Sequence, residues 1–434
     1  MAKPINPYLK PSPKDRQGPT NEELERSAHL ARERSKAVFI GITGSSAKSS
    51  TTALLDHILS GQRRVDLQLK LNSMRKTLDM LSKLPDDAEL VVAELGVSSE
   101  DPFRTAAQAF QPNTAVVTMI AMEHLEKFDS EQEIAAEKAE LLSALRPGGV
   151  AILNADDPFV MGMARVTNER IVTFGRSENA TYRVSDVQAN YPNRLSLTIT
   201  HAGKPLALRT RFVGEHHWLA TTAAVSTALE HGVPGEVIAK RVASFEPLSD
   251  RFGAIETANG PNFIVDTAKT YPHSLKISFD AIAKASVSRK RIVMGPLSET
   301  DDDSPIYREV YRSAIEAADQ VIFVGKHFQL SDASQEDVDA GRFFLFETAK
   351  QVEDFIRETA MPGELILVKG SFSLHLERIG MSWREKVRCW HPECGVRIGC
   401  MDCGRYGFSF EWHQGYKHIG KVRRLLNKLN LHRG

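Results

Sequence analysis

The sequence has few cysteines, no excess of either charge and no long apolar run. Its four cysteines all lie between Cys389 and Cys403, so disulfide bonds cannot staple the body of the fold. Lysine and arginine total 55, as do aspartate and glutamate, and such a balance gives nucleic acid no general attraction. No stretch approaches the roughly 20 apolar residues of a membrane span, and the N-terminus has no apolar signal core. These absences predict a cytoplasmic protein without a membrane span or a nucleic-acid partner.

A chain of 434 residues is long enough for two or three domains that each bury a core. Changes of pattern along the sequence predict four parts. They are an N-terminal arm and exposed helix at 1–36, a central domain at 37–248, a smaller domain at 249–380 and a cysteine-rich tail at 381–434. The tail ends in a basic amphipathic stretch at 419–429, which we expect to dock on the body of the protein.

Apolar runs alternate with helical patterns through both domains. In the central domain the runs VFIGIT, LVVAEL, TAVVTMI and GVAILNA are separated by stretches such as SEQEIAAEKAELLSAL, which is typical of a mostly parallel sheet covered by helices. Residues 170–211 then alternate with period two, which predicts an antiparallel extension of that sheet. The runs FIVDTA, RIVMGP, QVIFVG and LILVKG repeat the strand signal after residue 249. The predicted fold class is therefore α/β, with a second, Rossmann-like α/β domain.

A loop rich in glycine and serine joins the first strand of the central domain to its first helix. Backbone N–H groups and the helix dipole can cradle phosphates there, Lys48 would reach the β- and γ-phosphates, and Ser49 or Ser50 would offer Mg²⁺ a hydroxyl. Ala47 stands where a standard phosphate loop has glycine, and a tight turn that merely caps the helix is the alternative. The pattern favours ATP binding by Gly44, Ser45, Ser46, Ala47, Lys48, Ser49 and Ser50.

Spacing places Glu94, His124 and Lys138 at strand ends and helix faces of one sheet. Singly, each has an ordinary interpretation: a solvated strand end, a helix cap and one charge on an acidic helix face. In this order, and with the segment NADDP at 154–158, they resemble the central domain of the Mur ligases. Within that family the TGSS loop and the HLE segment most resemble the ligase that adds D-alanyl-D-alanine. The resemblance covers about residues 38–380.

The resemblance implies a role for each of these residues in an ATP-dependent amide ligase. Lys48 and Ser49 would bind the triphosphate and a first Mg²⁺, Glu94 would support that ion, and His124 and Lys138 would hold a second Mg²⁺. In the family the matching lysine is carbamylated, and a carbamate presents anionic oxygen to a cation where an ammonium does not. The expected catalytic residues are Lys48, Glu94, His124, Lys138 and Arg251.

The second domain supplies residues that resemble those closing over the nucleotide in this family, namely Arg251, Asp266 and Lys269. Arginine and lysine suit a developing phosphoryl charge, and aspartate suits a pair of ribose hydroxyls. An interdomain salt bridge is the alternative. His217 is expected beside the nucleotide as well, although the family usually has asparagine there and at Ala220.

Together these residues predict a ligase that joins a carboxylate to an amine through an acyl phosphate, with Lys369-Gly370-Ser371 near the acceptor amine. The phosphate loop begins at Gly41, so we expect the UDP-sugar-binding N-terminal domain of the peptidoglycan enzymes to be absent. The substrates would then be small molecules or peptides other than a standard UDP-muramyl peptide. The alternative is a catalytically altered, nucleotide-binding interaction protein, which Ala47, His217 and Ala220 motivate. A generic kinase or NTPase would leave the histidine and lysine without a role.

The tail carries the pattern Cys389-x4-Cys394-x5-Cys400-x2-Cys403, which could hold one Zn²⁺ as thiolates. His391, His413 and His418 are alternative ligands. Reduced or disulfide-bonded cysteines in a loop are the other interpretation, and a cytoplasmic setting disfavours disulfides. The tail could also be a docking module for a protein partner.

Overall fold

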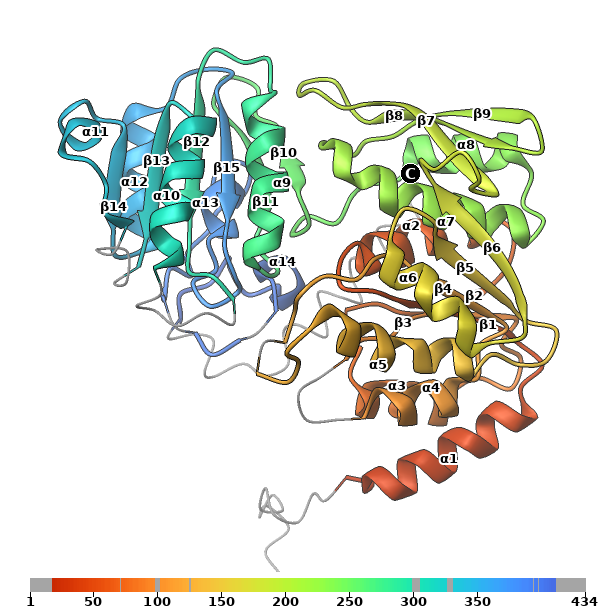
Figure 1. The fold of residues 1–434 in the computed structure, drawn as a ribbon. Coiled ribbons are helices and arrows are strands. Elements are labelled where there is room, and N and C mark those ends of the chain that lie inside the picture. Colours follow the sequence, from red (N-terminus) through yellow and green to blue (C-terminus); the bar gives the residue numbers. More distant parts are fainter. Residues whose placement is uncertain are drawn as a thin grey trace, which may run out of the picture.

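A computed structural model describes residues 18–70, 72–97, 102–124, 126–298, 305–325, 331–392, 394–396 and 398–410. Figure 1 shows two α/β lobes side by side, each built around its own sheet, with α14 at the boundary between them. The predicted ligands His413 and His418 and the amphipathic stretch at 419–429 lie outside the described residues. Within the described residues, no helix has the length and hydropathy to cross a lipid bilayer.

The first sheet has nine strands in the order β2-β3-β1-β4-β5-β6-β7-β8-β9. Neighbours from β2 to β7 run parallel, and β7, β8 and β9 are antiparallel. The antiparallel extension predicted for 170–211 is therefore confirmed from β7 onward, whereas β6, at its start, continues the parallel sheet. The strands are β1 (Val38–Thr43), β2 (Val65–Gln68), β3 (Leu90–Glu94), β4 (Thr114–Val117), β5 (Val150–Asn154), β6 (Arg170–Gly175), β7 (Tyr182–Gln188), β8 (Ser196–His201) and β9 (Lys204–Arg209).

Helices cover both faces of this sheet. Successive residues of a strand point to opposite faces, so Phe39 packs in the core under α3, α4 and α5, while Ile40 packs in the core under α2, α7 and α8. Burial on both faces explains why these strands are continuous apolar runs. The helices are α2 (Lys48–Leu59), α3 (Met74–Ser82), α4 (Phe103–Phe110), α5 (Glu131–Ser143), α6 (Pro158–Gly162), α7 (Trp218–Glu230) and α8 (Gly235–Ser244), with 3-10 turns at Met163–Val166 and Glu215–His217.

The second sheet has six strands in the order β10-β11-β15-β12-β13-β14, and β10 alone is antiparallel to its neighbour. Its strands are β10 (Gly253–Ile255), β11 (Asn262–Asp266), β12 (Lys290–Met294), β13 (Gln320–Val324), β14 (Phe343–Phe346) and β15 (Leu365–Lys369). Its helices are α9 (Pro272–Ala283), α10 (Ile306–Ala317), α11 (Gln335–Asp339), α12 (Ala349–Thr359), α13 (Glu377–Met381) and α14 (Cys400–Cys403).

The N-terminal helix α1 (Asn21–Arg34) is packed against the first lobe, which corrects the prediction of an exposed helix. Leu24 and Ala28 join the core beneath it. Arg32 is 1% exposed, donates to the carbonyl oxygens of Phe110 and Gln111 at 2.9 and 2.8 Å, and lies over the ring of Phe39 at 3.8 Å. Burial lowers the pKa of Arg32 to about 10. The charged composition of the helix concealed this buried face.

Candidate nucleotide and ligation site

The phosphate loop connects the carboxyl end of β1 to the first turn of α2. Gly44 has φ +140°, and a Cβ there would lie 2.0 Å from Oγ1 of Thr118, so only glycine fits. Ala47 has φ 65°, a left-handed conformation that favours glycine. The alanine that replaces the glycine of a standard phosphate loop is therefore a strained residue. Nζ of Lys48 donates to the carbonyl oxygen of Gly44 at 2.5 Å. The lysine therefore folds back over the loop, as phosphate binding requires.

Ser49, in the first turn of α2, meets Glu94 at the carboxyl end of β3. Oγ of Ser49 donates to Oε2 of Glu94 at 2.9 Å. Glu94 is 2% exposed and also accepts from Nδ2 of Asn72 at 2.9 Å and from the backbone N–H of Lys70 at 3.2 Å. A hydroxyl and a fixed carboxylate side by side are hard oxygen donors of the kind that Mg²⁺ prefers.

Lys138 is paired with Glu123, a residue next to His124 in the chain that was not predicted from the sequence. Nζ of Lys138 is 2.8 Å from Oε1 of Glu123, and both side chains are buried. Burial lowers the pKa of Lys138 to about 8, although Glu123 opposes this. Burial alone would raise the pKa of Glu123, but Lys138 and Lys48 hold it at about 2. The acidic residue directly before the predicted histidine was the available signal.

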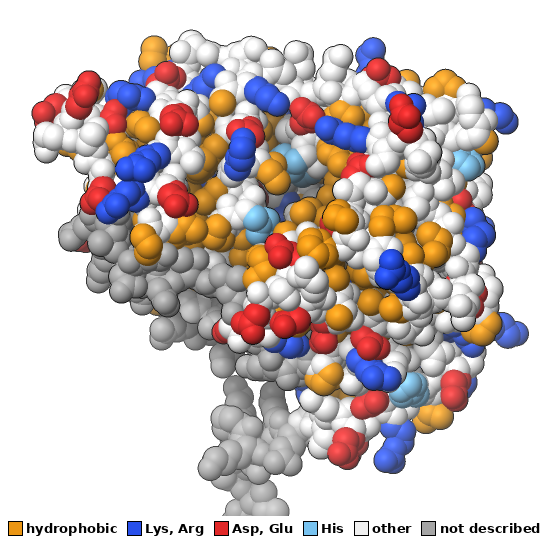
Figure 2. All heavy atoms as spheres, viewed as in Figure 1, with side chains coloured by type: hydrophobic (Ala, Val, Ile, Leu, Met, Phe, Trp, Pro, Cys, Tyr) orange, Lys and Arg blue, Asp and Glu red, His pale blue; other side chains and the backbone are white. Residues whose placement is uncertain are grey.

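A cavity of about 1210 Å³ lies between the two lobes. The first lobe contributes the phosphate loop, Glu94, Glu123 and His124 to its lining, and Lys138 is reached only through Glu123. The second lobe contributes Arg251, Asp266, Lys269 and Lys369. In Figure 2, histidine side chains gather near the boundary between the lobes, and acidic and basic side chains are interspersed over the visible face.

Asp266 and Lys369 are opposite residues at the ends of β11 and β15. Nζ of Lys369 donates to Oδ2 of Asp266 at 2.5 Å, and Lys369 is almost fully buried. Nζ of Lys269 donates to the hydroxyl of Tyr271 at 2.5 Å. Nε of Arg251 is buried and has no hydrogen-bond partner among the described residues. This part of the cavity therefore presents several cations to a phosphoryl group.

Aromatic rings form another part of the wall. His217 is 5% exposed and stacks on Phe212, with ring centroids 4.3 Å apart. Burial lowers the pKa of His216 to about 4 and holds the pKa of His217 well below its ordinary value. Both imidazoles are therefore neutral at pH 7 and suit an uncharged ring such as adenine better than a phosphate. Trp218 lines the same cavity, with the guanidinium of Arg176 4.9 Å from its ring.

The predicted acceptor segment is only partly in the wall. Lys369 and Phe372 line the cavity, whereas Gly370 and Ser371 do not. The backbone N–H of Gly370 donates to the carbonyl oxygen of Asp266 at 3.2 Å, which fixes the turn after β15. Oγ of Ser371 pairs with Oγ of Ser373 at 2.6 Å.

The cysteine segment reaches the same cavity through Ile398, Gly399, Met401 and Asp402, and none of its four cysteines is in the lining. Cys389, Cys394, Cys400 and Cys403 are all free of disulfide bonds, and Cys389 and Cys400 are buried. Among the described residues, the group whose ligand atoms lie within 4.8 Å of one another consists of His375, Glu377 and Cys400, rather than the four cysteines. Neither His375 nor Glu377 was predicted as a ligand from the sequence, and they precede the first cysteine, Cys389, by 14 and 12 residues.

Two α/β lobes on either side of a cavity that a phosphate loop lines define a nucleotide-binding α/β protein. Residues 42–228 match the family described as Mur ligase middle domain, and residues 250–372 match the family described as Mur ligase, glutamate ligase domain. The chain belongs to the Mur ligase family, and it is an ATP-dependent acid–amino-acid ligase of that type.

Similar proteins agree with this assignment. The UDP-N-acetylmuramoyl-tripeptide--D-alanyl-D-alanine ligase of Bacillus subtilis (strain 168) is 24% identical over 346 residues, which are 78% of this chain and 74% of that protein. The ligase of the same name from Rickettsia prowazekii (strain Madrid E) is 26% identical over 367 residues, or 82% and 80% of the two chains. MurF ligase from Thermotoga maritima, solved in complex with ADP, has a TM-score of 0.72 at 19% identity and 86% coverage of each chain, which shows the shared fold.

Proposed function

We propose that the protein joins a carboxylate to an amine in two steps at this cavity. A carboxylate oxygen attacks the γ-phosphorus of ATP, and the bond between that phosphorus and the β,γ-bridging oxygen breaks. ADP departs and an acyl phosphate remains. The amine nitrogen then attacks the acyl carbon, inorganic phosphate leaves, and the nitrogen gives up a proton. The supporting observation is that the phosphate loop, Arg251 and Lys369 line one cavity between the lobes. Such a cavity brings the reactants together and limits access of water to the acyl phosphate.

The chain's own cations would stabilise the transferring phosphoryl group. Lys48 lies over the phosphate loop, and the buried Nε of Arg251 has a free donor position within the described structure. Donors fixed in advance at a developing charge need little reorganisation during the reaction. Asp266, which neutralises Lys369, would be free to accept a ribose hydroxyl only with its second oxygen.

Ser49 and Glu94 fit a Mg²⁺ ion, because their oxygen atoms lie 2.9 Å apart at the carboxyl end of the sheet. A Mg²⁺ bound there would offset charge on the β- and γ-phosphates. Asn72 and the backbone of Lys70 hold the Glu94 carboxylate in place, so the donor pair is fixed before any ion binds.

Lys138 fits the neighbourhood of a second Mg²⁺ only when it is neutral or carbamylated, because an ammonium repels a cation. Its lowered pKa of about 8 leaves an appreciable fraction of neutral amine at pH 7, and a neutral amine can attack the carbon of CO₂ to give a carbamate and release a proton. The carbamate would lie beside the carboxylate of Glu123, which directly precedes His124 in the chain. A cation between these groups would relieve the repulsion between the two anions.

We propose further that the carboxylate substrate is not a standard UDP-muramyl peptide. The described lining of the cavity comes from the two lobes and from Ile398, Gly399, Met401 and Asp402, and smaller carboxylates or peptides suit a cavity of about 1210 Å³ lined in this way. The assay should therefore include UDP-muramyl tripeptide with D-alanyl-D-alanine as one arm beside mixed metabolites.

The test is to incubate the purified protein with ATP, Mg²⁺ and either a metabolite extract or the UDP-muramyl pair, and to follow ADP, phosphate and new masses by mass spectrometry. We expect condensation products from the extract, absent with Lys48→Ala and Lys138→Ala. Turnover of the UDP-muramyl pair would overturn the substrate proposal and leave ligation intact. ATP binding without turnover in either arm would favour the catalytically altered interaction protein, which the strained Ala47 motivates.

Three other predictions from the sequence stand beside this proposal. They are domain boundaries at 36/37, 248/249 and 380/381, a cytoplasmic location with a protein partner for the tail, and a zinc ion in the tail, for which the structure brings together a ligand set other than the predicted Cys389, Cys394, Cys400 and Cys403. None of them is needed for the ligation chemistry.

A further inference from the structure

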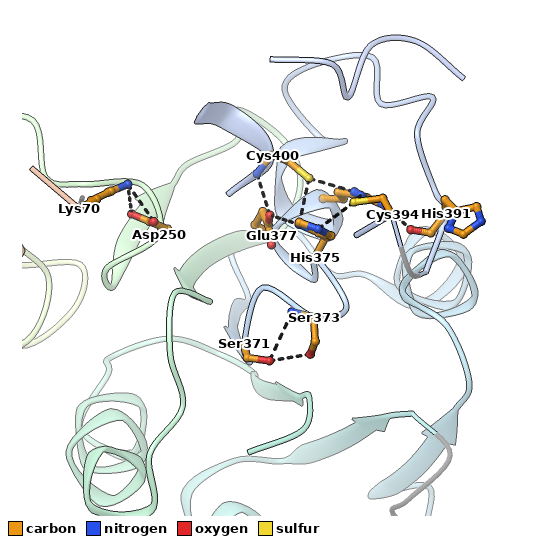
Figure 3. Close-up of polar contacts among 10 residues, drawn as sticks. Lys70, Asp250, Ser371, Ser373, His375, Glu377, His391, Cys394 and Cys400 are labelled. Atoms are coloured by element: carbon orange, nitrogen blue, oxygen red, sulfur yellow. Dashed lines mark hydrogen bonds and ion pairs between the residues drawn. The ribbon is translucent and has the colours of Figure 1, made fainter. Parts of the chain in front are cut away.

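Sulfur, imidazole and carboxylate groups converge on one buried point behind the cavity wall. Nδ1 of His375 lies 3.1 Å from Oε1 of Glu377 and 3.5 Å from Sγ of Cys400. Sγ of Cys394 lies 3.1 Å from Nε2 of the same imidazole. Figure 3 shows these four side chains pointing toward one another. His375, Glu377 and Cys400 are each no more than 4% exposed.

The distance between Sγ of Cys400 and Nδ1 of His375 is that of two ligands around one tetrahedral ion. With metal–sulfur and metal–nitrogen bonds of about 2.3 and 2.0 Å, tetrahedral angles place sulfur and nitrogen about 3.5 Å apart. The separation of Sγ of Cys400 from Nδ1 of His375 has this value. A histidine, a carboxylate and a thiolate together are typical zinc ligands.

A buried arginine faces the sulfurs. Arg378 is 2% exposed, and its Nε donates to Sγ of Cys400 at 3.0 Å while Nη2 lies 3.9 Å from Sγ of Cys394. Its third contact is the carbonyl oxygen of His391 at 2.8 Å. A buried guanidinium needs acceptors with negative charge, and a metal-bound thiolate supplies it. Hydrogen bonds that orient the ligands of a zinc ion in this way are common.

The same segment forms part of the wall of the ligation cavity. Gly399, Met401 and Asp402 line the cavity beside Cys400, which points the other way toward His375. The carboxylate of Asp402 reaches Nζ of Lys70 on the first lobe at 3.1 Å. Lys70 also pairs with Asp250, at 2.9 Å, where the second lobe begins. Cys400 therefore connects the residues that line the cavity to the buried His375 and Glu377 of the second lobe.

An anchor of this kind is needed because α14 is a single turn. A helix of four residues does not form on its own, since nucleation costs more than its few hydrogen bonds return. The backbone N–H of Cys400 donates to Oε1 of Glu377 at 2.9 Å, which gives one attachment. A metal–sulfur bond at the same residue would give a second.

We propose that a zinc ion is bound by Nδ1 of His375, by Glu377 and by Cys400, with Cys394 holding the imidazole from its other nitrogen, Nε2, and that this ion fixes residues 398–402 as a wall of the ligation cavity. Cys403 is not a ligand. The metal site stands by itself, and its effect on ligation rests on the proposed function. Loss of the ion would release Asp402 from Lys70, so that the substrate side of the cavity opens while the phosphate loop is unchanged.

The test of the site is the zinc content of the full-length protein, purified without a polyhistidine tag and measured by inductively coupled plasma mass spectrometry. We expect about one zinc per chain in the wild type, a loss of about tenfold or more in His375→Ala and Cys400→Ser, and no loss in Cys403→Ser. Cys403→Ser is the matched control, because both cysteines lie in α14. A wild type without zinc, another metal at one per chain, or equal losses in Cys403→Ser and Cys400→Ser would overturn the proposal.

The effect on the cavity is tested separately from folding and from ligation. In His375→Ala we expect ADP affinity unchanged, cleavage by trypsin within residues 384–405 faster, and KM for the carboxylate raised more than kcat is lowered. In Asp402→Asn we expect the zinc retained and the same rise in KM. Unchanged cleavage of the zinc-free variant would overturn the anchoring role. Should no substrate be turned over, zinc content and cleavage still decide the proposal.

Discussion

Nζ of Lys138 lies 2.8 Å from Oε1 of Glu123, and the two side chains are 0% and 4% exposed. The lysine is on α5 and the glutamate follows β4, so the pair joins α5 to the segment that leads into His124. Burying two charges is costly, and apolar replacements of such pairs are often neutral or stabilising. The pair is therefore best explained by the chemistry of the cavity that Glu123 lines.

Removing one partner of this pair should be harmful. In Glu123→Gln the ammonium of Lys138 loses its neighbouring charge in a fully buried position, so we expect the free energy of unfolding at pH 7 to fall by about 3 kcal/mol. Chemical denaturation measures this loss. The double variant Glu123→Gln/Lys138→Met should recover part of it, and a double variant less stable than Glu123→Gln would contradict the account.

The pH dependence of ligation should report Lys138. Burial lowers its pKa to about 8 from 10.5, so its neutral form, which carbamylation needs, increases as pH rises through about 8. We expect the rate at limiting bicarbonate to rise with pH over this range, with a midpoint near 8. Glu123 raises the pKa of Lys138, so Glu123→Gln should move the midpoint to lower pH. A midpoint that stays in place would exclude Lys138 as the titrating group.

The same shift has a consequence for stability. Lys138 is deprotonated above about pH 8 in the folded state but only above 10.5 in the unfolded chain. Between these values the unfolded state binds more protons, so this group makes stability increase with pH. Lys138→Met should flatten the stability profile in that window, which urea denaturation at several pH values can measure.

Much of the fold follows from local pattern, whereas parts of the site depend on contacts between distant residues. Phe39 and Ile40 are both apolar because each face of the sheet is covered, and this run predicts a buried parallel strand. Glu123 lies in a loop without periodicity, so nothing but its neighbour His124 marked it. His375 and Cys394 are nineteen positions apart, with α13 and a stretch of irregular chain between them, and no spacing rule predicts that approach.

The burial of α1 illustrates the same limit. In the sequence Arg32 resembles one charge of a solvated helix. Its guanidinium nevertheless donates to the carbonyl oxygens of Phe110 and Gln111 at the end of α4, 78 and 79 residues away. Arg32→Met removes those bonds and leaves the two carbonyls unsatisfied, so we expect a loss of about 2 kcal/mol in stability. ADP affinity of the folded variant should be unchanged. A midpoint of thermal denaturation within about one degree of the wild-type value would show that α1 is not part of the fold.

Two substitutions in the phosphate loop should have opposite effects. Gly44→Ala would place a Cβ 2.0 Å from Oγ1 of Thr118, so the loop must shift and ADP binding should be lost. Ala47→Gly relieves a left-handed alanine, and we expect stability to change by between about 0 and +1 kcal/mol with ADP binding retained. Isothermal titration with ADP checks both. Tight ADP binding by Gly44→Ala would contradict the geometry given for the loop.

The most direct test of ligation through an acyl phosphate is the fate of the carboxylate oxygen. Once a carboxylate and an amine are identified, the reaction is run with the carboxylate labelled with ¹⁸O, and the released phosphate is analysed by mass spectrometry. The account predicts one ¹⁸O atom in each phosphate, because the attacking oxygen stays on phosphorus when the amine displaces it, and it predicts ADP as the nucleotide product. Unlabelled phosphate formed together with the amide, or release of AMP and pyrophosphate, would contradict it.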